Sequence, residues 1–339
     1  MITFKKYSSI ENTFDRGFVE KIHLEGFASG QYVVQEKVHG SNVCFITDGQ
    51  TVQFAKRTGL VEADEKFYDY TELFERYKPK ALGLFQRLKA KYSDIESLLI
   101  YGEMFGGNYP HRDVKKHPAT SAIQKGVYYS PVHEFYGFDL CISTAENTRY
   151  LPVNEINELF EKEEFLHAKT LFQGTLNECL EYPNAFPSRI PEWLNLPAIE
   201  DNICEGVVIR PVEPLYLRNG SRILLKNKNS RFAEKKAVKN RPSTPPAEQT
   251  GSEALISLFD IVESYITENR LNSVVSKIGE VSVPHDFGKL MGLLSKDILE
   301  DFLKEHENEY SLLEKNEQKI LNRRVNKRAM DLIKQIYMQ

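Results

Sequence analysis

The spacing of hydrophobic positions separates a strand-rich N-terminal part of the chain from a helical C-terminal part. Short apolar runs at residues 32–34 and 43–46 flank a polar, glycine-containing segment, a pattern that predicts a strand–turn–strand unit. Asp48 and Gly49 form a hairpin signal, and residues 51–56 then alternate between apolar and polar as a returning strand does. Further strands are expected at residues 98–101, 135–140, 203–210 and 223–228.

Other stretches have a helical period. Apolar side chains recur every three or four residues at 5–30, 79–92 and 154–169, which predicts a helix in each stretch. Residues 240–251 are rich in Pro, Ser and Thr, the composition of an interdomain linker. Helical patterns follow up to the last residue. The predicted fold class is therefore α+β, with antiparallel sheets and flanking helices at 1–239, a linker at 240–251 and a small all-helical domain at 252–339.

Composition narrows the class of protein. A chain of 339 residues that is 41% hydrophobic can build one large core or two ordinary ones. The four cysteines are far apart and form no CxxC pair, so neither a disulfide framework nor a zinc site is expected. The first residues lack the apolar stretch of a signal peptide, and no long apolar run occurs. We expect a soluble cytoplasmic protein without a membrane partner.

Charge is distributed unevenly. The net charge of −4 by itself argues against a general nucleic-acid binder. Between Arg210 and Arg241, however, ten basic residues face two acidic ones, a local net charge of +8 (10 − 2). A solvated loop is the simpler explanation of such a run, but the apolar residues 223–225 lie within it and fix part of it on a strand. The window therefore predicts a site for a polyanion.

The candidate chemistry centres on Lys37, in the segment EKVHGSN at 36–42. A lysine fixed at the end of a strand can be partly desolvated, and burial and nearby cations both disfavour its ammonium form, which leaves a nucleophilic amine. On its own the segment is so short that an ordinary hairpin with a surface lysine is the better explanation. Partners elsewhere decide the question. Glu103 stands between an apolar strand and a glycine-rich loop, where a ligand contact and a solvent-facing acid at a strand end are equally good explanations. Lys226 and Lys228 share one face of a strand, where an anion between them would relieve their repulsion.

Six motifs follow one another in a characteristic order: EKVHGSN at 36–42, KRTG at 56–59, YGE at 101–103, FD at 138–139, EGVVIR at 205–210 and KNK at 226–228. Together they resemble the covalent nucleotidyltransferases, the superfamily of ATP-dependent ligases and capping enzymes. The chain is most similar to the RNA ligase 2 family of T-even phages, because His39 stands where DNA ligases and capping enzymes usually carry Asp, with Asn42 following. Residues 270–280 and 286–292 resemble that family's C-terminal domain, so the resemblance covers nearly the whole chain.

The resemblance implies an ATP-grasp-like nucleotidyltransferase domain and a three-step reaction. Lys37 attacks the α-phosphate of ATP to form a lysyl–AMP, AMP passes to an RNA 5′-phosphate, and an adjacent 3′-OH displaces AMP to seal the nick. The cofactors implied are ATP and Mg²⁺ (or Mn²⁺), and the implied substrate is nicked duplex RNA, with an RNA/DNA hybrid as a further candidate. The C-terminal helical domain would hold the duplex, and a monomer is the default oligomeric state.

The resemblance also assigns residues. Phe138 would stack on adenine, Glu103 would hold the ribose hydroxyls, and Glu205 would bind the metal directly or through its water. The catalytic residues would be Lys37, Lys226 and Lys228. The ATP or AMP contacts would be Glu36, Lys37, Val38, Asn42, Arg57, Glu103, Phe138, Glu205, Lys226 and Lys228. The RNA contacts would be Arg57, Arg218, Arg222, Lys235 and Lys236.

Three alternatives stay open: an ATP-dependent DNA ligase, an mRNA guanylyltransferase, and a non-catalytic duplex-RNA-binding protein. His39 and the helical pattern at the C-terminal end, in place of an OB-fold, speak against the first two. The presence of every motif residue speaks against the third. Arg210 closes its motif where relatives often carry Lys, which leaves its role as a phosphate contact open, and Asp139 is a candidate for a structural role.

Overall fold

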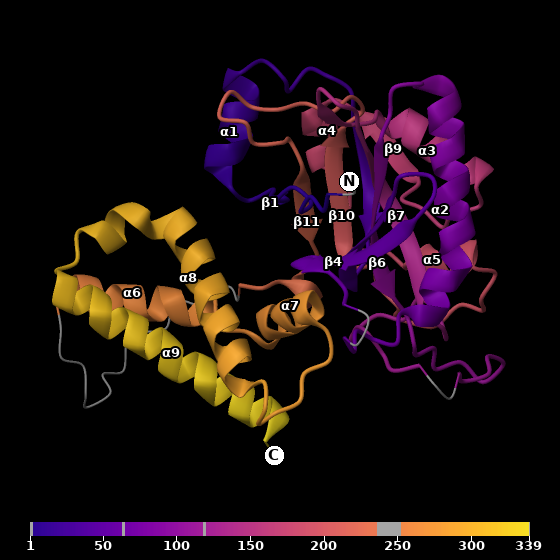
Figure 1. The fold of residues 1–339 in the computed structure, drawn as a ribbon. Helices are drawn as coiled ribbons and strands as arrows, with labels where there is room; N and C mark the ends of the chain where they lie inside the picture. Colours follow the sequence, from indigo (N-terminus) through magenta and orange to yellow (C-terminus); the bar gives the residue numbers. More distant parts are fainter. Residues whose placement is uncertain (1–2, 63–64, 118–119, 236–251, 339) are drawn as a thin grey trace. The chain divides into compact units, whose positions relative to one another are not determined.

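The structure, a computed structural model, describes residues 3–62, 65–117, 120–235 and 252–338. The chain forms two compact units (Figure 1). The first extends to Arg231 and includes Ser276–Gly279, and the second comprises Phe232–Val275 and the residues from Glu280 onward. The predicted linker at 240–251 lies outside the described residues, so the predicted domain bounds at 239 and 252 stay predictions.

The first unit contains two sheets. One sheet has five strands in the order β1-β11-β10-β2-β9, with β1 parallel to β11 and the other pairs antiparallel. Its strands are β1 (Glu11–Asn12), β2 (Tyr32–Lys37), β9 (Thr170–Gly174), β10 (Gly206–Pro211) and β11 (Leu225–Lys228). Helices α1 (Arg16–Leu24) and α4 (Leu176–Leu180) bury apolar side chains against one face of this sheet. The opposite face is therefore the one available to a ligand.

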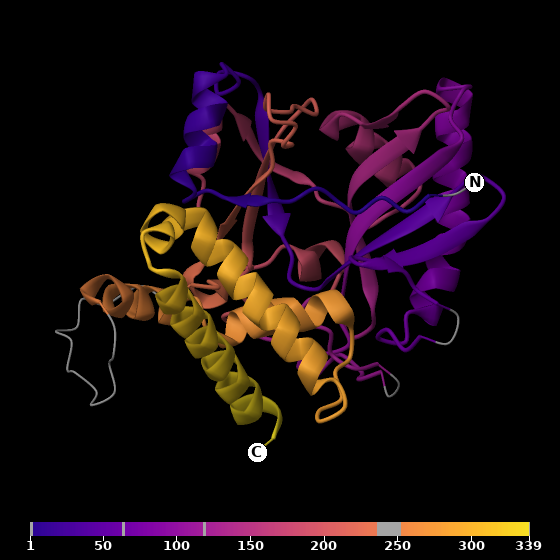
Figure 2. The same ribbon diagram turned by 60° about the vertical axis from the view of Figure 1, so that its left-hand side comes forward.

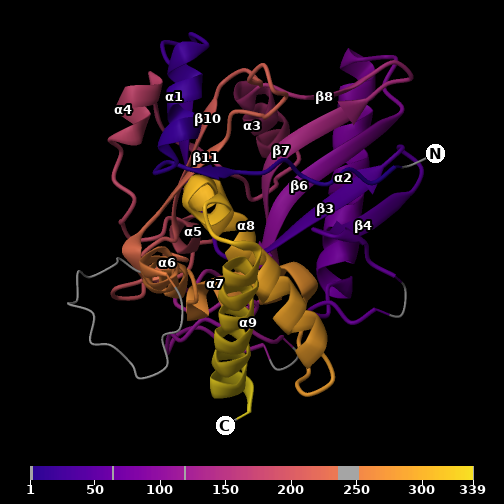
Figure 3. The ribbon, with the colours of Figure 1, turned by 90° about the vertical axis from the view of Figure 1, so that its left-hand side faces the viewer.

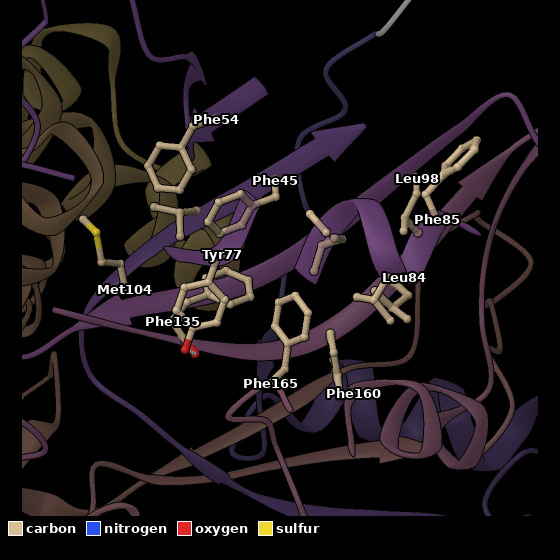
Figure 4. Close-up of a cluster of buried hydrophobic side chains, with 14 of the residues drawn as sticks. Phe45, Phe54, Tyr77, Leu84, Phe85, Leu98, Met104, Phe135, Phe160 and Phe165 are labelled. Carbon is tan, nitrogen blue, oxygen red and sulfur yellow. Dashed lines mark hydrogen bonds between the residues drawn. The ribbon is translucent and has the colours of Figure 1, made fainter. Parts of the chain in front are cut away.

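The second sheet is antiparallel throughout, with six strands in the order β5-β4-β3-β6-β7-β8. The strands are β3 (Ser41–Thr47), β4 (Val52–Lys56), β5 (Gly59–Leu60), β6 (Ser97–Phe105), β7 (Glu134–Ser143) and β8 (Thr148–Tyr150). Helices α2 (Thr71–Lys91) and α3 (Val153–Lys162) supply apolar side chains to the core on one face, where Phe45 and Phe135 pack edge to face with ring centroids 5.0 Å apart (Figure 4). A short helix, α5 (Ile190–Trp193), precedes β10.

The N-terminal segment links the two sheets. Tyr7 packs against Tyr101 and Phe138 of the six-stranded sheet, with ring centroids 4.9 and 5.0 Å away. A few residues later β1 pairs with β11 of the five-stranded sheet, and Figure 2 shows this indigo segment crossing from one sheet to the other. The N-terminal segment therefore contacts both sheets and links the five-stranded sheet to the six-stranded one.

The second unit is helical, as the pattern predicts. It contains α6 (Glu253–Ser264), most of α7 (Glu268–Ile278), α8 (Phe287–Ser311) and α9 (Lys315–Tyr337). Gly279, with φ of +92°, ends α7 as expected, because glycine adopts this backbone conformation without strain. Buried Arg270 of α7 donates to Asp297 and Asp301 of α8 at 2.7 and 2.9 Å and so fixes one helix to the other. None of the described helices has the length and apolar character needed to cross a membrane.

Several predicted elements differ from the observed ones. The helix predicted at 5–30 is only α1, because Glu11 and Asn12 form the strand β1 and Phe14, which is 60% exposed, does not extend the buried side of the helix. The helix at 79–92 begins earlier, at Thr71, and contains Pro79 in its interior. The helix predicted at 154–169 ends at Lys162, and Glu164 then adopts a φ of +54°. The hairpin at Asp48 is confirmed between β3 and β4.

Candidate active site

Lys37 is the last residue of β2, where the chain leaves one sheet for the other. The strand–turn–strand unit predicted around it is confirmed, but β2 and β3 belong to different sheets and do not form a hairpin. Gly206 of β10 pairs with Lys37 on one side and with Lys228 of β11 on the other. Paired residues point to the same face of a sheet, so both lysines project from the uncovered face. Lys226, two residues before Lys228, projects from that face as well.

Gly206 makes this three-strand row possible. Its φ of +147° lies in the region that favours glycine, and a Cβ there would stand 2.1 Å from the carbonyl oxygen of Asn227. A larger residue would therefore push β11 away from β10 and separate Lys228 from Lys37. The motif at 205–210 contains Gly206, but only the pairing of the strands shows that this glycine lets β10 and β11 approach each other.

Glu205 joins the two lysines. Its Oε2 lies 2.8 Å from Nζ of Lys37 and its Oε1 lies 3.0 Å from Nζ of Lys228, while its side chain is only 1% exposed. Burial alone would raise the pKa of Glu205, but Lys228, Lys37 and the imidazole of His39, whose Nδ1 is 3.8 Å away, lower it to about 2. The carboxylate is therefore ionised at neutral pH and is shared between the candidate nucleophile and a second cation.

Glu103 lies on the sheet that faces this row. It pairs with Asn42 across β6 and β3, so both side chains point away from the α2 core. Burial raises the pKa of Glu103 to about 7, the charge of Lys37 opposes the rise, and the charge of Glu205 adds to it. The side chain of Arg57, in the turn after β4, is electrostatically coupled to Glu103 as well, and burial lowers the pKa of that guanidinium. Four of the predicted nucleotide contacts, Asn42, Arg57, Glu103 and Lys37, therefore converge.

A β-bulge presents Phe138. Tyr101 of β6 pairs with Asp139 and Gly102 pairs with Gly137, which leaves Phe138 as the extra residue of β7. A bulge re-aims the side chain at its position. The ring of Phe138 is half-buried and packs on Tyr7, so one aromatic surface stays partly accessible near the predicted nucleotide contacts. No feature of the sequence indicates this partnership with Tyr7.

Asp139 and two arginines form a buried cluster. Its Oδ1 accepts a hydrogen bond from Arg210 at 3.1 Å, and its Oδ2 accepts from Arg222 at 2.7 Å and from the hydroxyl of Tyr7 at 2.7 Å. Burial opposes ionisation of Asp139, but the two guanidinium groups outweigh it and lower its pKa. The guanidinium of Arg222 also stacks 3.6 Å from the ring centroid of Tyr150.

This cluster corrects two expectations. Arg222 was expected to contact RNA, but it is only 5% exposed and its charge is neutralised by Asp139. Arg210 was a candidate phosphate contact, but it is buried and its second contact is the carbonyl oxygen of Phe138 at 2.9 Å. Both arginines join the two sheets instead, and the structural role considered for Asp139 fits this arrangement.

The residues beside Lys37 differ in orientation. The side chain of Glu36 points to the covered face, where it accepts hydrogen bonds from the hydroxyl of Ser188 at 2.7 Å and the backbone N–H of Arg189 at 2.9 Å. A nucleotide could therefore meet Glu36 only at its backbone. Val38 is buried, and its carbonyl oxygen accepts a hydrogen bond from Nζ of Lys37 at 3.3 Å. The hydroxyl of Tyr129 contacts the backbone nitrogen of His39 at 3.0 Å, a partnership that the sequence does not indicate.

The other expected RNA contacts are dispersed. Arg218 is exposed on the loop before β11. Lys235 belongs to the helical unit, where its ammonium donates to the hydroxyl of Tyr265 at 2.8 Å and to Glu305 at 2.7 Å. Lys236 lies outside the described residues. Within the described part of the chain, no three His, Cys, Asp or Glu side chains are grouped to hold a metal ion.

Two protein-family models match this chain. The family model described as RNA ligase matches residues 30–228, and the model described as T4 RNA ligase 2 C-terminal matches residues 248–331. The mitochondrial RNA-editing ligase 1 of Trypanosoma brucei brucei is 30% identical over 345 residues, which cover 85% of this chain and 73% of that protein. The mitochondrial RNA-editing ligase 2 of the same organism is 27% identical, over 90% of this chain and 84% of its own.

Solved structures give a weaker likeness. A Naegleria gruberi RNA ligase mutant with ATP and Mn matches with a TM-score of 0.46 and 15% identity, over 68% of this chain and 58% of that one. Both trypanosome proteins are named mitochondrial, so the cytoplasmic location expected above stays a prediction. The RNA ligase model spans more than half of the chain, and the first relative shares 30% identity across most of both proteins. This chain therefore belongs to the RNA ligase family, in its RNA ligase 2 branch.

Proposed function

We propose that this protein is an ATP-dependent RNA ligase that joins a 3′-OH to a 5′-phosphate at a nick in duplex RNA, with Lys37 as its nucleophile. The observation that carries the proposal is the buried carboxylate of Glu205, which Lys37 and Lys228 share at 2.8 and 3.0 Å. A lysine held in this way has a fixed position at the end of β2 and a second cation beside it. Membership of the RNA ligase family supports RNA as the substrate.

In the first step, Nζ of Lys37 forms a bond to the α-phosphorus of ATP. The bond between that phosphorus and the bridging oxygen breaks, pyrophosphate leaves with the electron pair of that bond, and the nitrogen gives up its proton to solvent. Negative charge on the phosphoryl oxygens is then best stabilised by cations that are already in place. Lys228 and Lys226 project from the same sheet face as Lys37, and Arg57 lies near Glu103 opposite them. These three residues are our candidates for that role.

The nucleoside would lie between the two sheets. Phe138 offers an aromatic face for adenine, and base–aromatic stacking typically contributes about 1–3 kcal/mol per base. Glu103 would accept hydrogen bonds from the ribose hydroxyls, and Asn42, paired with it across the strands, stands beside it. A pKa of about 7 for Glu103 means that the carboxylate and the carboxylic acid are both accessible near neutral pH.

Glu205 fits one position in the shell of a divalent cation. Its oxygens are hard donors and its low pKa keeps them ionised, which suits Mg²⁺ or Mn²⁺. Among the described residues, no three His, Cys, Asp or Glu side chains are grouped so that they alone could hold the ion. Mg²⁺ in nucleotide sites commonly takes one or two carboxylates and completes its shell with phosphate oxygens and water. Bound in this way, the ion would neutralise charge on the nucleotide phosphates.

The chain would divide this work between two domains, 1–239 for adenylyl transfer and 252–339 for engaging the duplex. The match of residues 248–331 to the T4 RNA ligase 2 C-terminal model supports the second assignment. A-form duplexes are recognised by shape and by backbone contacts, so we expect little sequence preference and binding that weakens as salt increases.

The test is sealing of a nicked RNA duplex with ATP and Mg²⁺, and a 5′-adenylated strand separates the steps. The wild type should seal both substrates. Lys37→Ala should fail on the 5′-phosphate strand with ATP but still join the 5′-adenylated strand, because the last step does not need the nucleophile. Lys91→Ala, an exposed lysine on α2, is the matched control and should behave as the wild type. Sealing of the 5′-phosphate strand by Lys37→Ala would refute the proposal.

A further inference from the structure

Helix α9 concentrates positive charge within the helical unit. Its sequence contains seven Lys and Arg residues and two acidic ones, a net charge of +5 (7 − 2). Helix α8 contains three lysines and six acidic residues, a net charge of −3 (3 − 6). Helices α8 and α9 thus have net charges of opposite sign, and the net negative charge of the whole chain does not explain this difference. The positive charge belongs to one element.

Four of these cations share one exposed side of α9. Lys315, Lys319, Arg323 and Lys327 follow one another at intervals of four residues, and all four are exposed. We call these four residues the basic stripe. The buried side of the helix consists of Leu321, Val325, Ala329 and Ile333. Since four residues of helix rise about 6 Å, the stripe extends over about 18 Å. Figure 3 shows α9 in the foreground of the helical unit.

Two of the three remaining cations of α9 contact helix α6. Arg324 and Arg328 both contact Glu263 of α6, at 3.4 and 3.1 Å. Arg324 also stands 4.3 Å from the ring centroid of Phe259. The members of the basic stripe, in contrast, form no ion pair with any side chain that the structure describes. Like charges four residues apart on a helix repel one another, so the stripe destabilises the free helix unless an anion lies along it.

An open hollow adjoins the stripe. Arg323 and Lys327 line it together with Arg324 and Arg328, and Asp260, Glu263 and Asp331 complete its wall. The wall thus contains four cations and three carboxylates, and one of these carboxylates, Glu263, is already engaged by Arg324 and Arg328. Part of the stripe thus borders a recess large enough to admit a phosphate group.

We propose that the basic stripe binds the phosphate backbone of one strand of an RNA duplex. The proposal rests on the function proposed above and specifies which surface of the helical domain takes the RNA. A row of cations at a regular interval matches a row of phosphates, which also repeat regularly, and Lys and Arg are the usual phosphate partners. A membrane surface is a poorer match, because the stripe has no adjoining apolar face of the kind that inserts into lipid.

The test compares two variants of equal charge loss in the full chain. The triple variant Lys319→Gln, Arg323→Gln, Lys327→Gln removes three members of the stripe. The control, Lys289→Gln, Lys296→Gln, Lys304→Gln, removes three exposed lysines from α8. Binding to a nicked RNA duplex is measured by fluorescence anisotropy at several salt concentrations, with self-adenylylation and thermal unfolding measured in parallel.

We expect the stripe variant to bind the duplex more weakly and its salt dependence to fall by about 2–3 in the slope of log Kd against log salt, since each phosphate contact contributes about 0.9. The control should keep the slope of the wild type. Both variants should self-adenylylate as the wild type does. The control should also unfold as the wild type does, and the stripe variant should be at least as stable as the wild type, because the loss of like charges relieves their repulsion. An unchanged slope in the stripe variant, or equal losses in both variants, would overturn the proposal. Failure of the wild type to self-adenylylate would instead refute the function proposed above, so the two failures are distinguishable.

Discussion

The buried cluster around Asp139 allows a sharp test of the packing between the two sheets. Replacing Asp139 by Asn keeps the shape of the side chain and removes its charge. Two guanidinium groups, those of Arg210 and Arg222, then lose their shared anion while they stay buried. The substitution therefore leaves uncompensated positive charge where the N-terminal segment, β7 and β10 meet.

The expected cost follows from this burial. Removing one partner of a buried ion pair typically destabilises a protein by about 3–5 kcal/mol. Asn retains one acceptor oxygen, which can still serve Arg222 or Tyr7, so we expect about 3–4 kcal/mol for Asp139→Asn. That is a large fraction of the roughly 5–15 kcal/mol by which native proteins are stable. Asp94→Asn, an exposed aspartate of the same unit, should change stability by less than about 0.5 kcal/mol.

The assay is urea unfolding of both variants and the wild type at pH 7, followed by tryptophan fluorescence and circular dichroism. Asp139→Asn should lower the midpoint without changing the slope of free energy against urea, since the unfolded state is the same. If the stability of Asp139→Asn stayed within about 1 kcal/mol of the wild type, then the arginines would not depend on Asp139 and the cluster would not join the sheets.

Three further predictions concern the site. Glu205→Gln should lower the rate of self-adenylylation by about 10²-fold, because the position of Lys37 relative to Lys228 depends on this carboxylate. A rate within about threefold of the wild type would contradict its role. Phe138→Ala should raise the Kd for ATP by about 5- to 150-fold through lost stacking, measured by calorimetry, whereas Phe172→Ala, a partly exposed ring on β9, should leave it unchanged. Burial raises the pKa of Glu36 to about 7 in the folded protein, whereas the unfolded value is about 4.3. Between these two pH values the folded state binds more protons at Glu36 than the unfolded state does. The contribution of Glu36 to the free energy of unfolding therefore falls as the pH rises from about 4.3 to 7. Glu36→Gln should flatten the fall in stability between about pH 4.3 and 7, with a remainder due to Glu103; equal pH slopes in variant and wild type would argue against a buried carboxyl at this position.

The order of the motifs along the sequence predicted much of the site. Lys37, Glu205 and Lys228 are far apart in the chain, and the structure brings them within hydrogen-bonding or ion-pairing distance. Strand alternation correctly placed Lys226 and Lys228 on one face. The helical character of the C-terminal part was equally readable, because an amphipathic stripe repeats over several turns.

Other features depend on pairings that a single sequence does not contain. Arg222 stands in a basic window and was expected at the surface, but Asp139, 83 residues away, draws it into the interior. Whether a charge is solvated or buried depends on such distant partners. The sequence also does not show that β2 and β3 belong to different sheets. A short turn between two strands has the same sequence pattern whether the strands pair with each other or enter different sheets.

The boundaries of helices were the least predictable feature. The helix expected from Pro79 begins at Thr71, although proline donates no helical hydrogen bond, because Leu73 and Tyr77 bury the turns before Pro79 in the same core. The four-residue period at Phe14 and Phe18 continued beyond the real start of α1 at Arg16, and Asp15 caps the helix by accepting from the backbone nitrogen of Phe18 at 3.0 Å. The capping residue Asp15 therefore marks the start of α1 better than the spacing of the apolar residues does.

The central claim is that Lys37 forms the covalent bond to AMP, and mapping the site of modification tests it most directly. The protein is incubated with ATP and Mg²⁺, digested under conditions that preserve a phosphoramidate, and analysed by tandem mass spectrometry. Our account predicts one AMP attached to Nζ of Lys37, and no attachment in Lys37→Ala. AMP on Lys226, Lys228 or any other residue, or no AMP in the wild type, would contradict it.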